Sequence, residues 1–147
     1  MEFLKNINWF IKTDPKTATN RETFKKLTKE DFETIVFDDS TRENIKLSFP
    51  LNDNYSFFVT REIKRPVNVK ELLTTIYKFY KEPLNKKNMD KAFEDMEEWK
   101  EDIIYFYDGD ISRLTNFDVF TDTCEPDFCG LELNEETGEY TVHIGPE

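Results

Sequence analysis

Apolar residues recur along this chain at two different spacings, which predict helices in some segments and strands in others. The clearest helical spacing lies between Asn68 and Pro83, where apolar side chains return every three or four positions. They are Val69, Leu72, Leu73, Ile76, Tyr77 and Tyr80. Asn68 can cap this helix with Glu71 as the returning partner, and Pro83 ends it because proline lacks an amide donor.

A second helix is predicted from about residue 88 to residue 104. Its buried stripe comprises Met89, Ala92, Phe93, Met96, Trp99 and Ile103. Most of the remaining positions are acidic, namely Asp90, Glu94, Asp95, Glu97, Glu98, Glu101 and Asp102, and only Lys91 and Lys100 offset them. We therefore expect one long amphipathic helix with a strongly acidic outer face.

Alternation of apolar and polar residues predicts two β-hairpins. In the first hairpin Ile45, Leu47, Phe49 and Leu51 lie on one arm and Tyr55, Phe57 and Val59 on the other, with Asn52, Asp53 and Asn54 as turn residues. The second hairpin closes the chain. It places Phe128, Leu131 and Leu133 opposite Tyr140, Val142 and Ile144, with Thr137 and Gly138 in the connection.

The first forty residues are expected to form a mainly helical segment. Residues 1–12 favour a helix, although the alternation of Ile7, Trp9 and Ile11 fits a strand nearly as well. Residues 13–20 read as a loop, and residues 24–36 as one helix or two short ones with Thr28 and Asp31 as an N-cap pair. Residues 111–126 are expected to be irregular, with Leu114, Phe117, Val119 and Phe120 as anchors.

The order of these elements predicts an α+β fold, with a small and mainly antiparallel sheet covered by amphipathic helices. With 147 residues the chain is expected to form one domain, in which residues 1–40 are the helical segment and residues 41–147 the α+β core. Fourteen phenylalanines supply enough apolar area for a core that needs neither a disulfide nor a metal.

No run approaches the roughly 20 apolar residues of a membrane helix, and residues 1–12 lack the pattern of a signal peptide. Two cysteines are too few for a disulfide framework, so a reducing cytoplasm is the expected location.

The charges are distributed very unevenly. Residues 1–87 hold 17 Lys and Arg against 13 Asp and Glu, a net of +4, whereas residues 88–147 hold 3 against 18, a net of −15. This predicts an acidic interaction face at Glu94, Glu97, Glu98, Glu101 and Asp102. Such a face attracts a protein partner with a basic surface and repels nucleic acid and anionic membranes. The alternative is a merely solvated helix face.

The basic residues do not predict a nucleic-acid site, because Arg61, Lys64, Arg65, Lys86 and Lys87 are too sparse for one. A homo-oligomer is compatible with the sequence.

The residues that could carry chemistry are few. Cys124, Cys129 and His143 are the only soft metal ligands, and a zinc site would need a fourth ligand from Asp122, Glu125 or Asp127. The same three residues are the only candidates for nucleophilic catalysis. The alternative is two ordinary thiols and a histidine on the outer side of an edge strand. Four scattered glycines cannot build a phosphate-binding loop. We therefore expect no catalytic residues, no metal site and no cofactor.

Two stretches resemble a known group of proteins. The first runs from Pro66-Val67-Asn68 through Leu72-Leu73, Ile76-Tyr77 and Phe79-Tyr80 to Pro83-Leu84, and the second joins residues 127–132 to residues 140–145. Together they resemble a family of small, uncharacterised proteins of giant DNA viruses, over roughly residues 45–147. Gly145-Pro146 departs from that pattern. The resemblance implies a viral protein that acts in the host cytoplasm or in the virion, and it implies no activity.

The sequence therefore favours a non-enzymatic protein-interaction module, a viral accessory or virion-associated protein. The alternative is an acidic inhibitor that imitates nucleic acid and blocks a basic protein. An enzyme built on Cys124, Cys129 and His143 is a third hypothesis. All three rest on the expectation that the aromatic stripes, including Tyr77, Trp99 and Phe128, fill the interior while the carboxylates face water.

Overall fold

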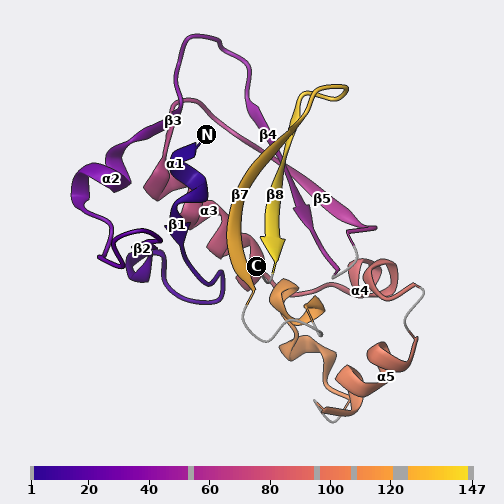
Figure 1. Cartoon of the computed structure of the whole chain (residues 1–147). Coiled ribbons are helices and arrows are strands. Elements are labelled where there is room, and N and C mark those ends of the chain that lie inside the picture. Colours follow the sequence, from indigo (N-terminus) through magenta and orange to yellow (C-terminus); the bar gives the residue numbers. More distant parts are fainter. Residues whose placement is uncertain (1, 53–54, 95–96, 107–108, 121–125, 146–147) are drawn as a thin grey trace.

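Four strands form the main sheet, in the order β5-β4-β8-β7 (Figure 1). In the computed structural model, which describes residues 2–52, 55–94, 97–106, 109–120 and 126–145, both predicted hairpins are present. β4 (Ile45–Pro50) pairs with β5 (Phe58–Ile63), and β7 (Asp127–Asn134) pairs with β8 (Glu139–Gly145), each antiparallel. The second arm of the first hairpin begins at Phe58, three residues later than expected. The α+β class is confirmed.

The two hairpins are joined by a parallel pair. Leu47 of β4 lies opposite Tyr140 of β8, and Ser48 lies opposite Thr141. This pairing brings together segments that are more than ninety positions apart, and it converts two local hairpins into one sheet. Hairpin patterns specify only local partners, so the sequence did not reveal this arrangement.

Helix α3 (Val69–Lys81) packs on this sheet and supplies much of the core. The side chain of Asn68 accepts a hydrogen bond from the amide of Glu71, which confirms the predicted cap. The Phe49 ring of β4 stacks on the Phe79 ring at 4.2 Å, and both side chains are buried. The Tyr80 hydroxyl donates to the Pro50 carbonyl at 2.8 Å. Burial raises the Tyr80 pKa well above its ordinary value.

The N-terminal segment contains short strands as well as helices. Its elements are α1 (Glu2–Lys5), β1 (Ile7–Asn8), η1 (Pro15–Thr17), β2 (Thr19–Asn20), α2 (Lys29–Glu33) and β3 (Ile35–Phe37). The helix expected over residues 1–12 ends at Lys5, because the next residues run beside β7 instead. The Trp9 carbonyl accepts from the Phe128 amide at 2.9 Å, and the Ile11 amide donates to the Pro126 carbonyl at 3.2 Å. This extended path buries Ile7, Trp9 and Ile11, so the strand interpretation of their alternation was the better one.

A short antiparallel ladder holds α2 beside α3. β3 pairs with β6 (Val67–Asn68), and the Val69 amide at the start of α3 donates to the Thr34 carbonyl at 2.9 Å. Thr28 and Asp31 form the predicted capping box at the start of α2. The end of one helix is thus tied to the beginning of the other.

The long helix expected over residues 88–104 is wrong, because the structure has two helices there. α4 (Lys86–Ala92) ends at Phe93, whose backbone leaves the helical region at φ −109° and ψ 22°, and α5 (Glu97–Phe106) follows. The carbonyl of Ala92 accepts from the buried Asn52 side chain at 3.4 Å. A continuing helix would need that carbonyl for the amide four residues later. The stripe positions Met96, Trp99 and Ile103 lie outside the residues whose side chains the structure describes.

The described residues 109–120 between α5 and β7 are irregular, as predicted for this region, with two short turns of 3-10 helix, η2 (Ile111–Arg113) and η3 (Asn116–Val119). Leu114, Val119 and Phe120 are buried there, and Phe117 is half-buried. No helix in the described part of the chain is both long enough and apolar enough to cross a membrane.

Candidate binding groove

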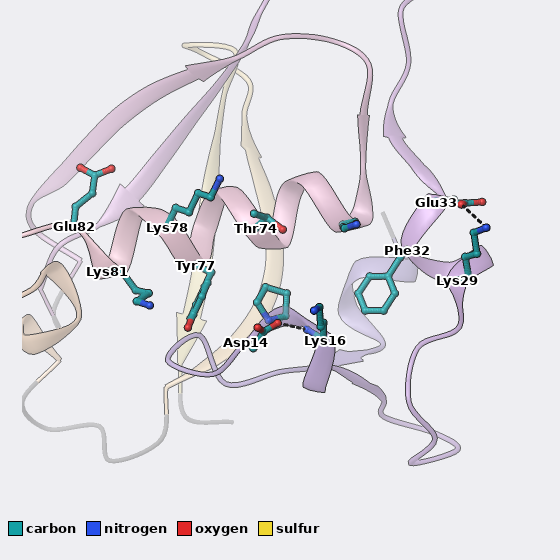
Figure 2. A pocket seen from close by; sticks show the side chains of 12 residues that line it. Asp14, Lys16, Lys29, Phe32, Glu33, Thr74, Tyr77, Lys78, Lys81 and Glu82 are labelled. Carbon is teal, nitrogen blue, oxygen red and sulfur yellow. Dashed lines mark hydrogen bonds and ion pairs between the residues drawn. The ribbon is translucent and has the colours of Figure 1, made fainter.

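An open groove of about 840 Å³ runs between α3 on one side and α2 with η1 on the other (Figure 2). Its lining residues come from three stretches of sequence and are Asp14, Pro15, Lys16, Lys29, Phe32, Glu33, Lys70, Thr74, Tyr77, Lys78, Lys81 and Glu82. The wall is mainly apolar, since lysine stems and three ring-bearing side chains supply most of its surface. The rim carries the charged groups.

Local structure fixes the side of the groove that faces α3. Asp14 caps η1 by accepting from the Lys16 amide at 2.9 Å, which turns the chain so that Pro15 is buried and Lys16 is exposed. Phe32 projects from α2, and Figure 2 shows its ring directed toward the space between α2 and η1. Tyr77 and Lys81 project from α3 toward η1 in the same view.

The carboxylates that line the groove are already engaged within the fold. Asp14 serves as the cap of η1, and Glu33 lies 3.9 Å from the Lys29 ammonium one helical turn away. Glu82 receives two hydrogen bonds from the Arg61 guanidinium, at 2.9 and 3.1 Å. Arg61 itself does not line the groove. Lysines nevertheless outnumber the acids in the lining by five to three, and Arg61 offsets the charge of Glu82.

The lining lysines differ from the lining acids in this respect. In the part of the chain that the structure describes, no ion pair involves Lys16, Lys70, Lys78 or Lys81. The Lys81 ammonium lies 5.0 Å from the centre of the Tyr77 ring, which fits a cation–π contact. The groove is thus an apolar trough whose available charge is positive.

Tyr77 departs from the expectation that every aromatic residue of the α3 stripe fills the interior. It is half-buried and lines the groove, and its hydroxyl has no hydrogen-bond partner among the described residues. Phe128, by contrast, is fully buried as expected. Sequence reasoning found none of the groove lysines. A weak signal existed on α3, where Lys70, Thr74 and Lys78 recur every four residues, but nothing linked this row to Lys16.

The predicted acidic face is exposed on and just before α5. Glu94, Glu97, Glu98, Glu101 and Asp102 all face solvent. Lys100, the nearest cation in sequence, is used elsewhere, because its ammonium donates to the Asp90 carboxylate at 2.5 Å. This hydrogen bond is the main cause that lowers the Asp90 pKa below its ordinary value. The five carboxylates are therefore left to dominate the surface.

The candidate metal and catalytic residues do not assemble in the described structure. Cys124 lies outside the described residues. Cys129 is half-buried, and its thiol lies 3.5 Å from the Asp127 carbonyl. His143 is exposed, with its ring against the edge of Tyr55 at 5.7 Å. Among the described residues, no three His, Cys, Asp or Glu side chains gather as metal ligands.

Comparison with known proteins found no relative of this chain. No protein-family model, curated protein or solved structure matches the chain. The groove and the acidic face are therefore the features from which function has to be argued.

Proposed function

We propose that this protein is a non-enzymatic interaction module whose groove binds a short acidic segment of another polypeptide, anchored by an apolar side chain. The observation that carries the proposal is the groove itself, where four lysines without an ion-pair partner in the described part of the chain surround a mainly apolar wall. Binding sites commonly combine such a wall with a few polar groups that fix orientation.

The two parts of the groove have different roles. Carboxylates of the ligand pair with Lys16, Lys70, Lys78 or Lys81, which sets the register and speeds association. An apolar ligand side chain enters between Tyr77 and Phe32 and contributes roughly 25 cal/mol for each Å² of apolar surface removed from water. Exposed ion pairs contribute only about 0–1 kcal/mol each, so the apolar anchor supplies much of the affinity.

A short acidic peptide fits this site better than a long polyanion. Nucleic acid extends well beyond one groove, and it would meet the strong negative charge of residues 88–147. The Lys81 ammonium also occupies one face of the Tyr77 ring, which leaves less room for base stacking. A peptide confined to the groove avoids both conflicts.

The test uses a short synthetic peptide rich in glutamate with one central phenylalanine, and its glutamine and lysine counterparts. We expect the glutamate peptide alone to bind, with an affinity that falls as salt rises because ion pairs are screened. The double variant Lys16→Glu and Lys70→Glu should bind at least about tenfold more weakly, equivalent to about 1.4 kcal/mol. Lys70 lies in the first turn of α3, where a carboxylate suits the helix dipole, so the fold should tolerate the change.

The matched control is Lys86→Glu with Lys87→Glu. It makes the same change in net charge in the first turn of α4, away from the groove, and it should bind like the wild type. Equal losses in both double variants would reject the groove as the site. A single-stranded RNA that bound as tightly as the peptide would reject a peptide ligand.

A second candidate is the acidic inhibitor, which the exposure of the five acidic residues on and before α5 favours. It predicts salt-sensitive binding to a lysine-rich peptide, lost when Glu94, Glu97, Glu98 and Glu101 are reversed to lysine. Unchanged binding after these substitutions would exclude it. A viral origin and a place in the host cytoplasm or the virion stay predictions from the resemblance described above.

A further inference from the structure

We propose that the segment taken up by the groove is α5 of a second copy of this chain, so that the protein associates head to tail. This inference rests on the proposed function, because it names the ligand of the same groove. It requires that the α5 face match the groove in charge, in spacing and in its apolar anchor.

The charges of the two surfaces are complementary. The groove offers the ammonium groups of Lys16, Lys70, Lys78 and Lys81, none of which has an ion-pair partner among the described residues. The α5 face offers exposed carboxylates, while Lys100, the cation within α5, is held by Asp90. Each surface therefore lacks the charge that the other presents.

The spacings also agree. Glu97, Glu101 and Tyr105 recur every four residues on α5, which places them about 6 Å apart along one side of a helix. Lys70 and Lys78 lie eight residues apart on α3, or about 12 Å. The row on α5 has the same length, so with Glu97 opposite Lys70, Tyr105 lies beside Tyr77 and Lys78, and Glu101 lies between the two lysines, opposite Thr74.

Tyr105 supplies the apolar anchor. Its side chain is 84% exposed at the end of the acidic row, which is unusual for an aromatic ring. In the groove, Tyr77 and Phe32 are half-buried rings flanked by lysine stems. A tyrosine between them buries its ring and keeps its hydroxyl near the polar rim.

One copy cannot make this contact with itself. Figure 1 shows α2 and α5 at opposite ends of the molecule, with the sheet and α3 between them. The pairing is therefore between different surfaces of two copies, and such a heterologous contact builds either a closed ring or an open chain.

The test measures self-association of the full chain by sedimentation velocity over a range of concentrations. The groove variant Lys16→Glu with Lys70→Glu, and the helix variant Glu97→Lys with Glu101→Lys, should each associate at least tenfold more weakly than the wild type. An equimolar mixture of the two variants should associate again, because the intact α5 of one meets the intact groove of the other. This recovery also shows that both variants are folded.

The control variant Glu135→Lys with Glu136→Lys changes net charge by the same amount in the turn between β7 and β8, and it should leave association unchanged. A wild-type chain that stays monomeric while the glutamate peptide still binds the groove would overturn this inference and leave the proposed function standing. Failure of both measurements would reject the groove proposal itself. A mixture that does not recover would also overturn the head-to-tail contact.

Discussion

The groove and the α5 face are built on opposite uses of charge. In the groove every lining carboxylate is engaged by a neighbour, as in the pair between Glu82 and Arg61, and lysines remain available. On the α5 face Lys100 is engaged by Asp90, and carboxylates remain available. The groove has a mixed local composition, yet its usable charge is positive.

This difference shows that composition alone does not determine the charge a surface offers. Residues 1–87 carry a net charge of only +4, and no run of basic residues marks the groove. The fold creates the basic surface by pairing the acids and by bringing lysines from separate segments together. Four predictions test this comparison, from the largest expected effect to the smallest.

The groove and the α5 face should differ most in how strongly a substitution there destabilises the fold. Replacement of Phe49 by alanine removes a fully buried ring that stacks on Phe79 beneath the groove helix. It should lower the free energy of unfolding by about 3–5 kcal/mol in urea denaturation. Tyr105→Ala on the exposed α5 face should change it by no more than about 0.5 kcal/mol. Similar losses of unfolding free energy in the two variants would contradict the expectation that the groove helix packs on the core and the α5 face does not.

Removing the partner of a paired acid should weaken peptide binding in the groove. Arg61→Ala leaves the Glu82 carboxylate without its bidentate partner at the rim. We expect the affinity for the glutamate peptide to fall by about two- to fivefold, since one exposed charge is worth about 0.5–1 kcal/mol. The double variant with Glu82→Gln should recover the affinity in the same titration. If the double variant stays weak, Arg61 acts in some way other than by neutralising Glu82.

Another exposed aromatic residue belongs to neither surface. Phe24 is 79% exposed and has a left-handed backbone with φ 59°. This conformation costs a bulky residue about 1 kcal/mol, and asparagine tolerates it better. Phe24→Asn should therefore raise the thermal midpoint slightly and leave peptide affinity unchanged. A loss of affinity would mean that the binding surface extends to the β2 turn.

The smallest effect concerns the ion pair beside α5. The Lys100 hydrogen bond lowers the Asp90 pKa in the folded state, so the ionised carboxylate stabilises the fold. That contribution is present above the ordinary pKa of an aspartate and disappears as the pH falls through the lowered value. Wild type and Asp90→Asn should differ in thermal midpoint near neutrality and converge in acid. Asp102→Asn, which leaves the ion pair intact, should show no such convergence.

Local patterns predicted the local structure of this protein and missed most of its long-range structure. The α3 stripe, its Asn68 cap and both hairpins depend on neighbours within a few positions, and all are present. The parallel contact of β4 with β8 depends on segments far apart in sequence. The break after α4 depends on Asn52, forty residues away. Neither of these two features can be recognised from the spacing of apolar residues along the sequence.

The candidate sites follow the same rule. The exposure of the acidic residues was predictable because they are close in sequence, four of them on α5 and Glu94 just before it. The groove was not, because Lys16 and the lysines of α3 line one surface only after η1 and α2 pack beside α3. Tyr77 was assigned to the core since its spacing matches the α3 stripe, and periodicity cannot separate the edge of a stripe from its centre.

The central claim is that the groove beside α3 is the surface that receives an acidic peptide. Backbone amide chemical-shift mapping of the wild-type chain, titrated with the glutamate peptide, tests it most directly. We expect the largest shifts in η1, α2 and the exposed side of α3, with smaller shifts in α5 only where the peptide displaces the α5 of a second copy. Shifts centred on α5 or on the outer strands, or no shifts at saturating peptide, would contradict it.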